Sequence, residues 1–257
     1  MLKYLGSSCD EAGTVVLLHA FPLSAAMWEP QRTFLESSGY RVIAPHVYGF
    51  DGSPSKPGWS MDDYARDLAA LLDTLGCRKA TIVGLSMGGY QSFAFWRLHP
   101  EMTSSLVLCD TRANADAPEA RAQRMEFRRA VEENGSGEAA ERMVPNFFDR
   151  NTAASHPELM SEAREMIVRQ PAEAISEAMR AIAERPDSTG LLPGISCPVL
   201  LLNGAGDVVT TPETAASMHA AIPGSKLEIL PGAGHLSNLE QPALFNRFLL
   251  EHLESLK

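Results

Sequence analysis

Short runs of apolar, often β-branched residues alternate along this chain with longer stretches in which apolar residues recur every three or four positions. The short runs predict strands over residues 14–19, 41–44, 80–83, 105–109, 198–202 and 226–230. The longer stretches predict helices over residues 28–37, 61–75, 90–98, 212–221 and 241–256. This alternation is typical of an α/β fold, in which a mostly parallel central sheet carries helices on both faces.

The alternation stops between residues 112 and 192. Helical patterns rich in Arg and Glu replace the strands there, over residues 117–133, 138–143, 158–168 and 172–184. We interpret this segment as a helical cap, inserted into an α/β core made of residues 1–111 and 193–257. Ligands of open α/β sheets bind at the carboxyl ends of the strands, where the insertion leaves and re-enters the sheet. The cap is therefore expected to cover the ligand site.

A Gly-x-Ser-x-Gly pattern occupies residues 84–88, directly after one expected strand and before the next helix. Such a strand-to-helix turn is a nucleophile elbow, which holds its serine, here Ser86, in a strained conformation with the hydroxyl above the sheet. The glycines Gly84, Gly88 and Gly89 would let the strand and the helix approach closely.

A serine hydroxyl needs a base to take its proton near neutral pH. His235 lies in a glycine-rich loop after the strand at 226–230, which could direct its imidazole back over the sheet edge. Asp207, in a glycine-rich turn after the strand at 198–202, is the favoured acid to orient that imidazole. Asp110 is a rival at the end of another strand, where we expect a structural carboxylate bonded to loop amides. The chain order Ser86, Asp207, His235 favours Asp207.

A tetrahedral intermediate also needs backbone donors for its oxyanion. The N–H of the residue after the nucleophile, Met87, is the first candidate. The second is the N–H of Phe21, in the loop that follows the strand at 14–19. A triad with these donors requires neither a metal nor an organic cofactor.

Composition narrows the class of protein. The 257 residues are 45% hydrophobic, enough for one large domain with a substantial core, and the net charge of −10 disfavours nucleic-acid and anionic-membrane partners. Four cysteines stand singly at positions 9, 77, 109 and 197, which disfavours a zinc site or a disulfide framework and predicts free thiols. The chain has no apolar run of membrane-spanning length and no signal-peptide pattern, so we expect a cytoplasmic enzyme of unspecified oligomeric state.

These motifs together resemble the α/β-hydrolase superfamily over nearly all of the chain outside the cap. The matching segments are residues 19–23, 27–31, 49–53, 84–89, 206–212 and 233–242. Within the superfamily, the chain is similar to small carboxylesterases, 3-oxoadipate enol-lactonases, pimeloyl-carrier-protein methyl esterases and cofactor-free perhydrolases. The resemblance implies a Ser-His-Asp hydrolase acting on a small ester or lactone, but the shared motifs do not choose among these subgroups.

Three features depart from the family pattern. Ala20 replaces a usual glycine, which affects the geometry of the Phe21 donor. His46 and Tyr48 occupy positions where family members commonly carry Asp and Arg, so a common structural ion pair is expected to be absent. Only about 13 residues precede the first predicted strand, so we expect one edge strand to be missing or very short.

The expected substrate pocket is apolar, with Trp28, Phe127, Met143 and Phe147 as candidate wall residues. Arginines in or beside the cap, from Arg112 to Arg142, are interleaved with glutamates at spacings that allow surface ion pairs. This pattern favours a small or medium neutral ester, with an enol-lactone or a perhydrolase reaction as alternatives. A non-catalytic binding protein of the same fold is a more distant alternative, which retention of all three triad residues disfavours.

Overall fold

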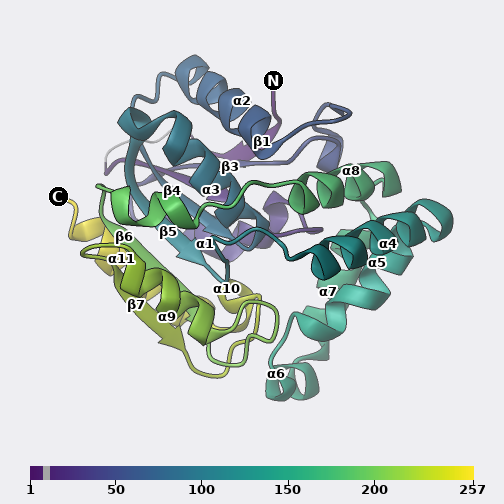
Figure 1. The fold of residues 1–257 in the computed structure, drawn as a ribbon. Coiled ribbons are helices and arrows are strands. Elements are labelled where there is room, and N and C mark those ends of the chain that lie inside the picture. The colour runs from purple at the N-terminus through teal and green to yellow at the C-terminus, as the bar shows by residue number, and fades with distance from the viewer. Residues whose placement is uncertain (8–11) are drawn as a thin grey trace.

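The computed structural model describes residues 1–7 and 12–257. Within these residues, seven strands form one sheet in the order β1-β3-β2-β4-β5-β6-β7 (Figure 1). Their bounds are β1 Tyr4–Gly6, β2 Thr14–Leu18, β3 Arg41–Pro45, β4 Ala80–Leu85, β5 Thr103–Cys109, β6 Val199–Gly204 and β7 Lys226–Leu230. All neighbouring strands are parallel except β1 and β3. The α/β fold with a mostly parallel sheet is thus confirmed.

The first strand, β1, has three residues and pairs antiparallel with β3, with Tyr4 opposite Pro45. It is absent from the six strands that the hydrophobic pattern predicts, because three residues, two of them exposed, carry no clear alternation. The expectation of a missing or very short edge strand is confirmed. Cys9 lies outside the described residues, whereas Cys77, Cys109 and Cys197 carry free thiols as expected.

Helices cover both faces of the sheet and leave its central strands fully buried. The helices of the core are α1 Glu29–Ser37, α2 Met61–Thr74, α3 Met87–Leu98, α9 Pro212–Ala221, α10 Ser237–Glu240 and α11 Pro242–Glu254. Helices α2 and α3 pack together on one face, and α1 packs with α11 on the other (Figure 1). Burial from both sides explains why a central strand such as β2 is apolar at nearly every position.

Between β5 and β6 the chain forms helices only, as the sequence predicts. They are α4 Pro118–Asn134, α5 Ser136–Met143, α6 Arg150–Ser155, α7 Pro157–Val168 and α8 Ala172–Ala183. Figure 1 shows them gathered beside the sheet, with α4 packed on α5 and α8 and with α5 packed on α7. Helix α6 is the one piece that the sequence pattern misses, because its six residues carry little apolar periodicity.

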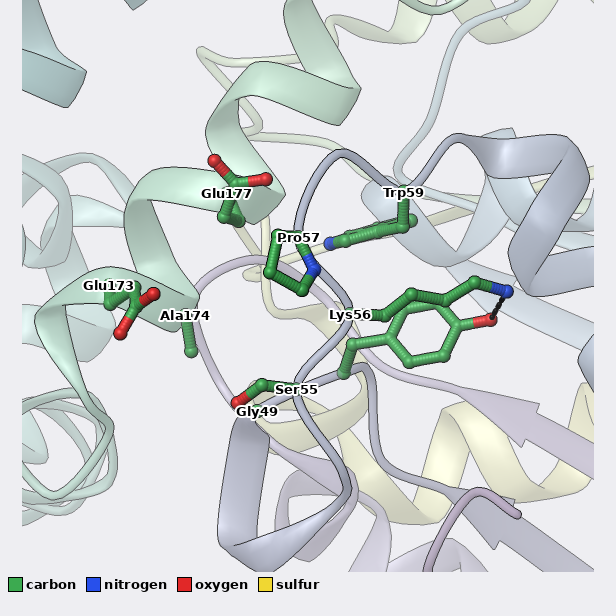
Figure 2. A pocket seen from close by; sticks show the side chains of 9 residues that line it. Gly49, Ser55, Lys56, Pro57, Trp59, Glu173, Ala174 and Glu177 are labelled. Atoms are coloured by element: carbon green, nitrogen blue, oxygen red, sulfur yellow. Dashed lines mark hydrogen bonds between the residues drawn. The ribbon is translucent and has the colours of Figure 1, made fainter.

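Helix α8 holds this helical group against a loop of the core. The N–H of Gly58 donates to the Glu177 carboxylate at 2.7 Å, and the Arg180 guanidinium donates to the Trp59 carbonyl at 2.6 Å. Figure 2 shows Glu177 and Ala174 facing this loop across a small cavity of about 20 Å³. None of the predicted catalytic residues lines this cavity, so we interpret it as part of the packing contact.

Candidate active site

Ser86 lies in the sharp turn between β4 and α3, as predicted. Its φ of 55° and ψ of −110° fall in a region that is strained for any residue with a side chain. A Cβ added to Gly84 would lie 2.3 Å from the Gly88 carbonyl oxygen, and one added to Gly88 would lie 2.1 Å from the Leu18 carbonyl oxygen. The close approach expected at these glycines is therefore confirmed.

His235 reaches Ser86 from the loop after β7. Its Nε2 lies 2.9 Å from Ser86 Oγ, and the histidine is 1% exposed. The ring of Phe147 stacks on the imidazole with centroids 5.9 Å apart, and the Phe147 carbonyl accepts a hydrogen bond from the Leu236 N–H. A residue from the helical segment thus packs directly on the predicted base.

Asp207 contacts the other nitrogen of the imidazole, with its Oδ2 2.9 Å from His235 Nδ1. Its second oxygen, Oδ1, accepts from the N–H groups of Val209 at 2.7 Å and Thr210 at 3.0 Å. Burial by itself raises the pKa of Asp207, but the charge of protonated His235 and the hydrogen bonds from His235 and Thr210 lower that pKa by more. Asp207 is therefore held as a carboxylate beside the histidine.

Asp110, the rival acid, is fully buried but forms different contacts. Its Oδ1 accepts from the Gly204 N–H at 2.8 Å, and its Oδ2 accepts from the Ser237 hydroxyl. The sequence predicts bonding to loop amides, whereas the structure shows one amide, at the end of β6, and one hydroxyl, at the start of α10. Burial, and next the charge of Asp207, raise the pKa of Asp110 well above its usual range.

The two predicted oxyanion donors lie on either side of the elbow. Met87 is the first residue of α3, where an N–H has no partner within the helix, and Phe21 follows β2 in a loop. Across the described residues, neither N–H donates to a protein acceptor. Ala20 is fully buried and its own N–H points to Met27 Sδ at 3.2 Å, which leaves the next amide, that of Phe21, available.

The predicted pocket residues separate into three groups. Phe127 and Met143 line a cavity of about 300 Å³ beside α4, and the Phe127 ring lies 6.1 Å from that of Phe21. Phe147 lies on His235 instead. Trp28 is fully buried in the core, with its ring 5.9 Å from that of Phe245 on α11, and it lines neither the cavity beside α4 nor the small cavity at α8.

Sequence reasoning assigned no role to two further residues at the site. The Thr210 hydroxyl donates to Asp207 Oδ2 at 2.6 Å and lies 3.3 Å from His235 Nδ1. The half-buried Glu240 carboxylate accepts from the Gly234 N–H at 2.7 Å and from the Asp149 N–H at 2.8 Å. It thereby fixes the histidine loop to the helical segment. Both residues stand in segments that match the family pattern. The contact of Thr210 with Asp207 is local, whereas its contact with His235 and that of Glu240 with Asp149 join residues distant in the chain.

His46 and Tyr48, which stand where family members commonly carry an Asp–Arg ion pair, form other polar contacts. The Tyr48 hydroxyl donates to Asp67, which pairs with Lys56 at 3.0 Å. His46 is buried, with its Nδ1 3.8 Å from the Asp51 carboxylate. These polar contacts stabilise the loop on which α8 rests.

This chain belongs to the α/β hydrolase fold family, whose model matches residues 13–242. It is 30% identical over 249 residues to 3-oxoadipate enol-lactonase 2 of Acinetobacter baylyi, covering 95% of this chain and 90% of that protein. Across the described residues, no helix combines the length and apolar character that spanning a bilayer requires.

Two solved structures extend the likeness over the whole fold. A thermophilic esterase from Thermogutta terrifontis, solved with malate bound, is 40% identical with a TM-score of 0.95, covering 99% of this chain and 93% of that one. The enol-lactonase of Burkholderia xenovorans is 27% identical with a TM-score of 0.89, covering 98% and 96% of the two chains. Together with the family match, these relatives support hydrolase activity on a small molecule.

Proposed function

We propose that this protein is a serine hydrolase that cleaves small to medium carboxylic esters through an acyl-enzyme. One observation carries the proposal. Ser86, His235 and Asp207, which are distant in the sequence, form one hydrogen-bonded series with both contacts at 2.9 Å. The esterase and enol-lactonase names of the relatives support the same chemistry.

In the acylation step, Ser86 Oγ attacks the ester carbonyl while His235 Nε2 takes the hydroxyl proton. Asp207 fixes the tautomer of His235 and stabilises the imidazolium that forms. The N–H groups of Met87 and Phe21 bind the oxygen on which negative charge develops. His235 then protonates the departing alkoxide, which leaves the acyl group on Ser86.

Deacylation repeats these steps with water as the nucleophile. His235 takes a proton from the water, the same two amides bind the second oxyanion, and the proton returns to Ser86 as the acid leaves. The reaction needs no cofactor. Neither the N–H of position 21 nor that of position 87 donates to an acceptor among the described residues, which supports this mechanism because both are available to an oxyanion.

We further propose that residues 112–192 act as a cap over a core of residues 1–111 and 193–257. The stacking of Phe147 on His235 and the contact of Phe127 with Phe21 support this division, because both bring the helical segment onto residues of the site. The cap would exclude water from the reacting groups and form one wall of the substrate pocket.

Hydrolysis of an enol-lactone is the second candidate function, because a lactone is a cyclic ester and can use the same groups. The similarity to two enol-lactonases of Acinetobacter baylyi, 30% and 26% identical, favours it. A perhydrolase reaction, which would use the same serine, is a further alternative. The similarity to a relative named as a putative non-heme bromoperoxidase, 29% identical, supports it.

The test is turnover of p-nitrophenyl esters of increasing acyl length, with Ser86→Ala as the control, beside labelling by a fluorophosphonate. We expect labelling of the intact protein alone, and a loss of kcat of about 10⁴- to 10⁶-fold in the variant. Activity that persists in Ser86→Ala, or a folded protein that hydrolyses no ester or lactone and resists the label, would contradict the proposal.

A further inference from the structure

The cavity beside α4 contains three arginines in different electrostatic settings. Arg124 pairs with Asp116, and Arg142 pairs with Glu126 at 2.8 Å and Glu138 at 2.7 Å. Both arginines are paired with carboxylates, as expected from the acidic residues near them in the sequence. Arg112, the third, is not paired in this way.

Arg112 has no carboxylate oxygen within 4.0 Å among the residues that the structure describes. Its Nη2 donates to the Val209 carbonyl, and its Nε is buried without a hydrogen-bond partner. A guanidinium presents five donors, and burying one of them unpaired costs free energy. The side chain therefore retains donors for a further acceptor.

Arg112 is linked to the proposed catalytic residues through Thr111 and Val209. It follows Thr111, whose hydroxyl donates to the Ser86 carbonyl at 2.7 Å. Its partner Val209 donates its own N–H to Asp207 at 2.7 Å. Phe127, on the wall of the same cavity, contacts the predicted oxyanion loop through Phe21. The Phe21–Phe127 contact thus joins the predicted oxyanion loop to a cavity of mixed polarity, whose wall includes Arg112.

We propose that Arg112 binds a carboxylate carried by the acyl part of the substrate, an inference that rests on the ester-hydrolase function proposed above. The preferred substrates are then half-esters of dicarboxylic acids or lactones that bear a carboxylate, rather than neutral esters. A guanidinium matches a carboxylate with two parallel hydrogen bonds. A local cation is also what an anionic substrate requires on a protein whose net charge is −10.

The experiment compares kcat/KM for the monomethyl and dimethyl esters of adipic acid, which differ in one charge. The intact protein should prefer the half-ester by about 10- to 100-fold, the range of a hydrogen bond to a charged group. In Arg112→Gln this preference should fall to about 3-fold or less, mainly through KM. Arg142→Gln, which removes a paired arginine from the same cavity, should keep the preference.

Equal efficiency on the two esters in the intact protein would overturn the inference, as would an equal loss of preference in both variants. Ser86-dependent turnover in those cases would leave the proposed function standing, whereas no turnover of either ester would contradict that function instead. If Arg112→Gln does not fold, inhibition of the intact protein decides. Adipate should inhibit dimethyl ester hydrolysis at least about 10-fold more strongly than hexanoate, and equal inhibition would overturn the inference.

Discussion

Two buried aspartates near His235 have pKa values that their surroundings shift in opposite directions. Asp207 accepts hydrogen bonds from His235, Thr210 and the backbone, and its pKa is lowered. Asp110 accepts one backbone N–H and one hydroxyl, faces the charge of Asp207, and has its pKa raised. Neighbouring carboxyls whose pKa values are driven apart take different roles. We assign Asp207 to the histidine and Asp110 to the joining of the end of β6 to the start of α10.

Asp110→Asn should change the pH dependence of stability. Below the unfolded-state pKa of about 4, Asp110 is neutral in both states and its contribution to folding is fully present. As pH rises towards the raised folded-state pKa, the unfolded chain releases the proton while the folded chain keeps it, so this contribution is lost. Asparagine does not titrate.

The free energy of unfolding in urea, measured for both proteins at pH 5 and pH 8, checks this prediction. The variant should gain stability relative to the wild type between the two values. A difference between the proteins that is independent of pH would show that Asp110 has an ordinary pKa. All other titrating groups are common to both proteins and cancel in the comparison.

The elbow depends on how closely α3 packs against β2 and β4. Gly88 lies within the first turn of α3, directly over the Leu18 carbonyl, and Gly84 lies under the same turn. This contact places the Met87 N–H at the start of the helix, beside Ser86. The glycines therefore fix the position of a proposed oxyanion donor as well as the packing of the helix.

Gly88→Ala should destabilise the fold by about 1–3 kcal/mol, because its Cβ would meet backbone that cannot move aside. The loss outweighs the gain of up to about 1 kcal/mol that alanine brings to a helix. Gly137→Ala in α5, where a Cβ meets nothing within 4 Å, is the matched control and should be neutral or slightly stabilising. Thermal unfolding compares them, and equal midpoints would refute the packing argument.

The molecule as a whole brings its site together at one edge of the sheet. Ser86, Asp207 and His235 follow three parallel strands, β4, β6 and β7, whose carboxyl ends lie on the same side. The helical segment contacts the core through Phe147, which stacks on His235, and through α8, which forms hydrogen bonds with the loop at residues 57–59. In the cap proposed above, the stability of this α8 contact should determine how well the site is covered.

Glu177→Ala should weaken this seating. It removes the acceptor of the Gly58 N–H and one partner each of Arg128 and Arg180, so we expect a loss of about 1–3 kcal/mol. Hydrogen exchange at the Gly58 amide should accelerate with it. Glu173→Ala is the control, because Glu173 is exposed one turn earlier on α8 beside the same small cavity. Equal exchange in both variants would contradict the role given to Glu177.

Local patterns in the sequence determined the strands, the main helices, the elbow, and Ser86 and His235 of the proposed triad, and they favoured Asp207 over Asp110 as its acid. Each of these has a signature within a few residues, such as the glycines around Ser86 or the glycine-rich turns before Asp207 and His235. The short elements β1 and α6 have too few residues for a periodic signal, and the sequence did not show them.

Only the tertiary structure decided which side chains meet across the chain. It placed Trp28 against Phe245 in the core and Phe147 on His235, and it distinguished Asp207 from Asp110 by their partners. It also showed that Arg112 has no carboxylate partner among the described residues, although the glutamates interleaved with the arginines of this segment predicted ion pairs. Burial and pairing depend on residues tens to hundreds of positions apart, and a local pattern carries no information about those distances.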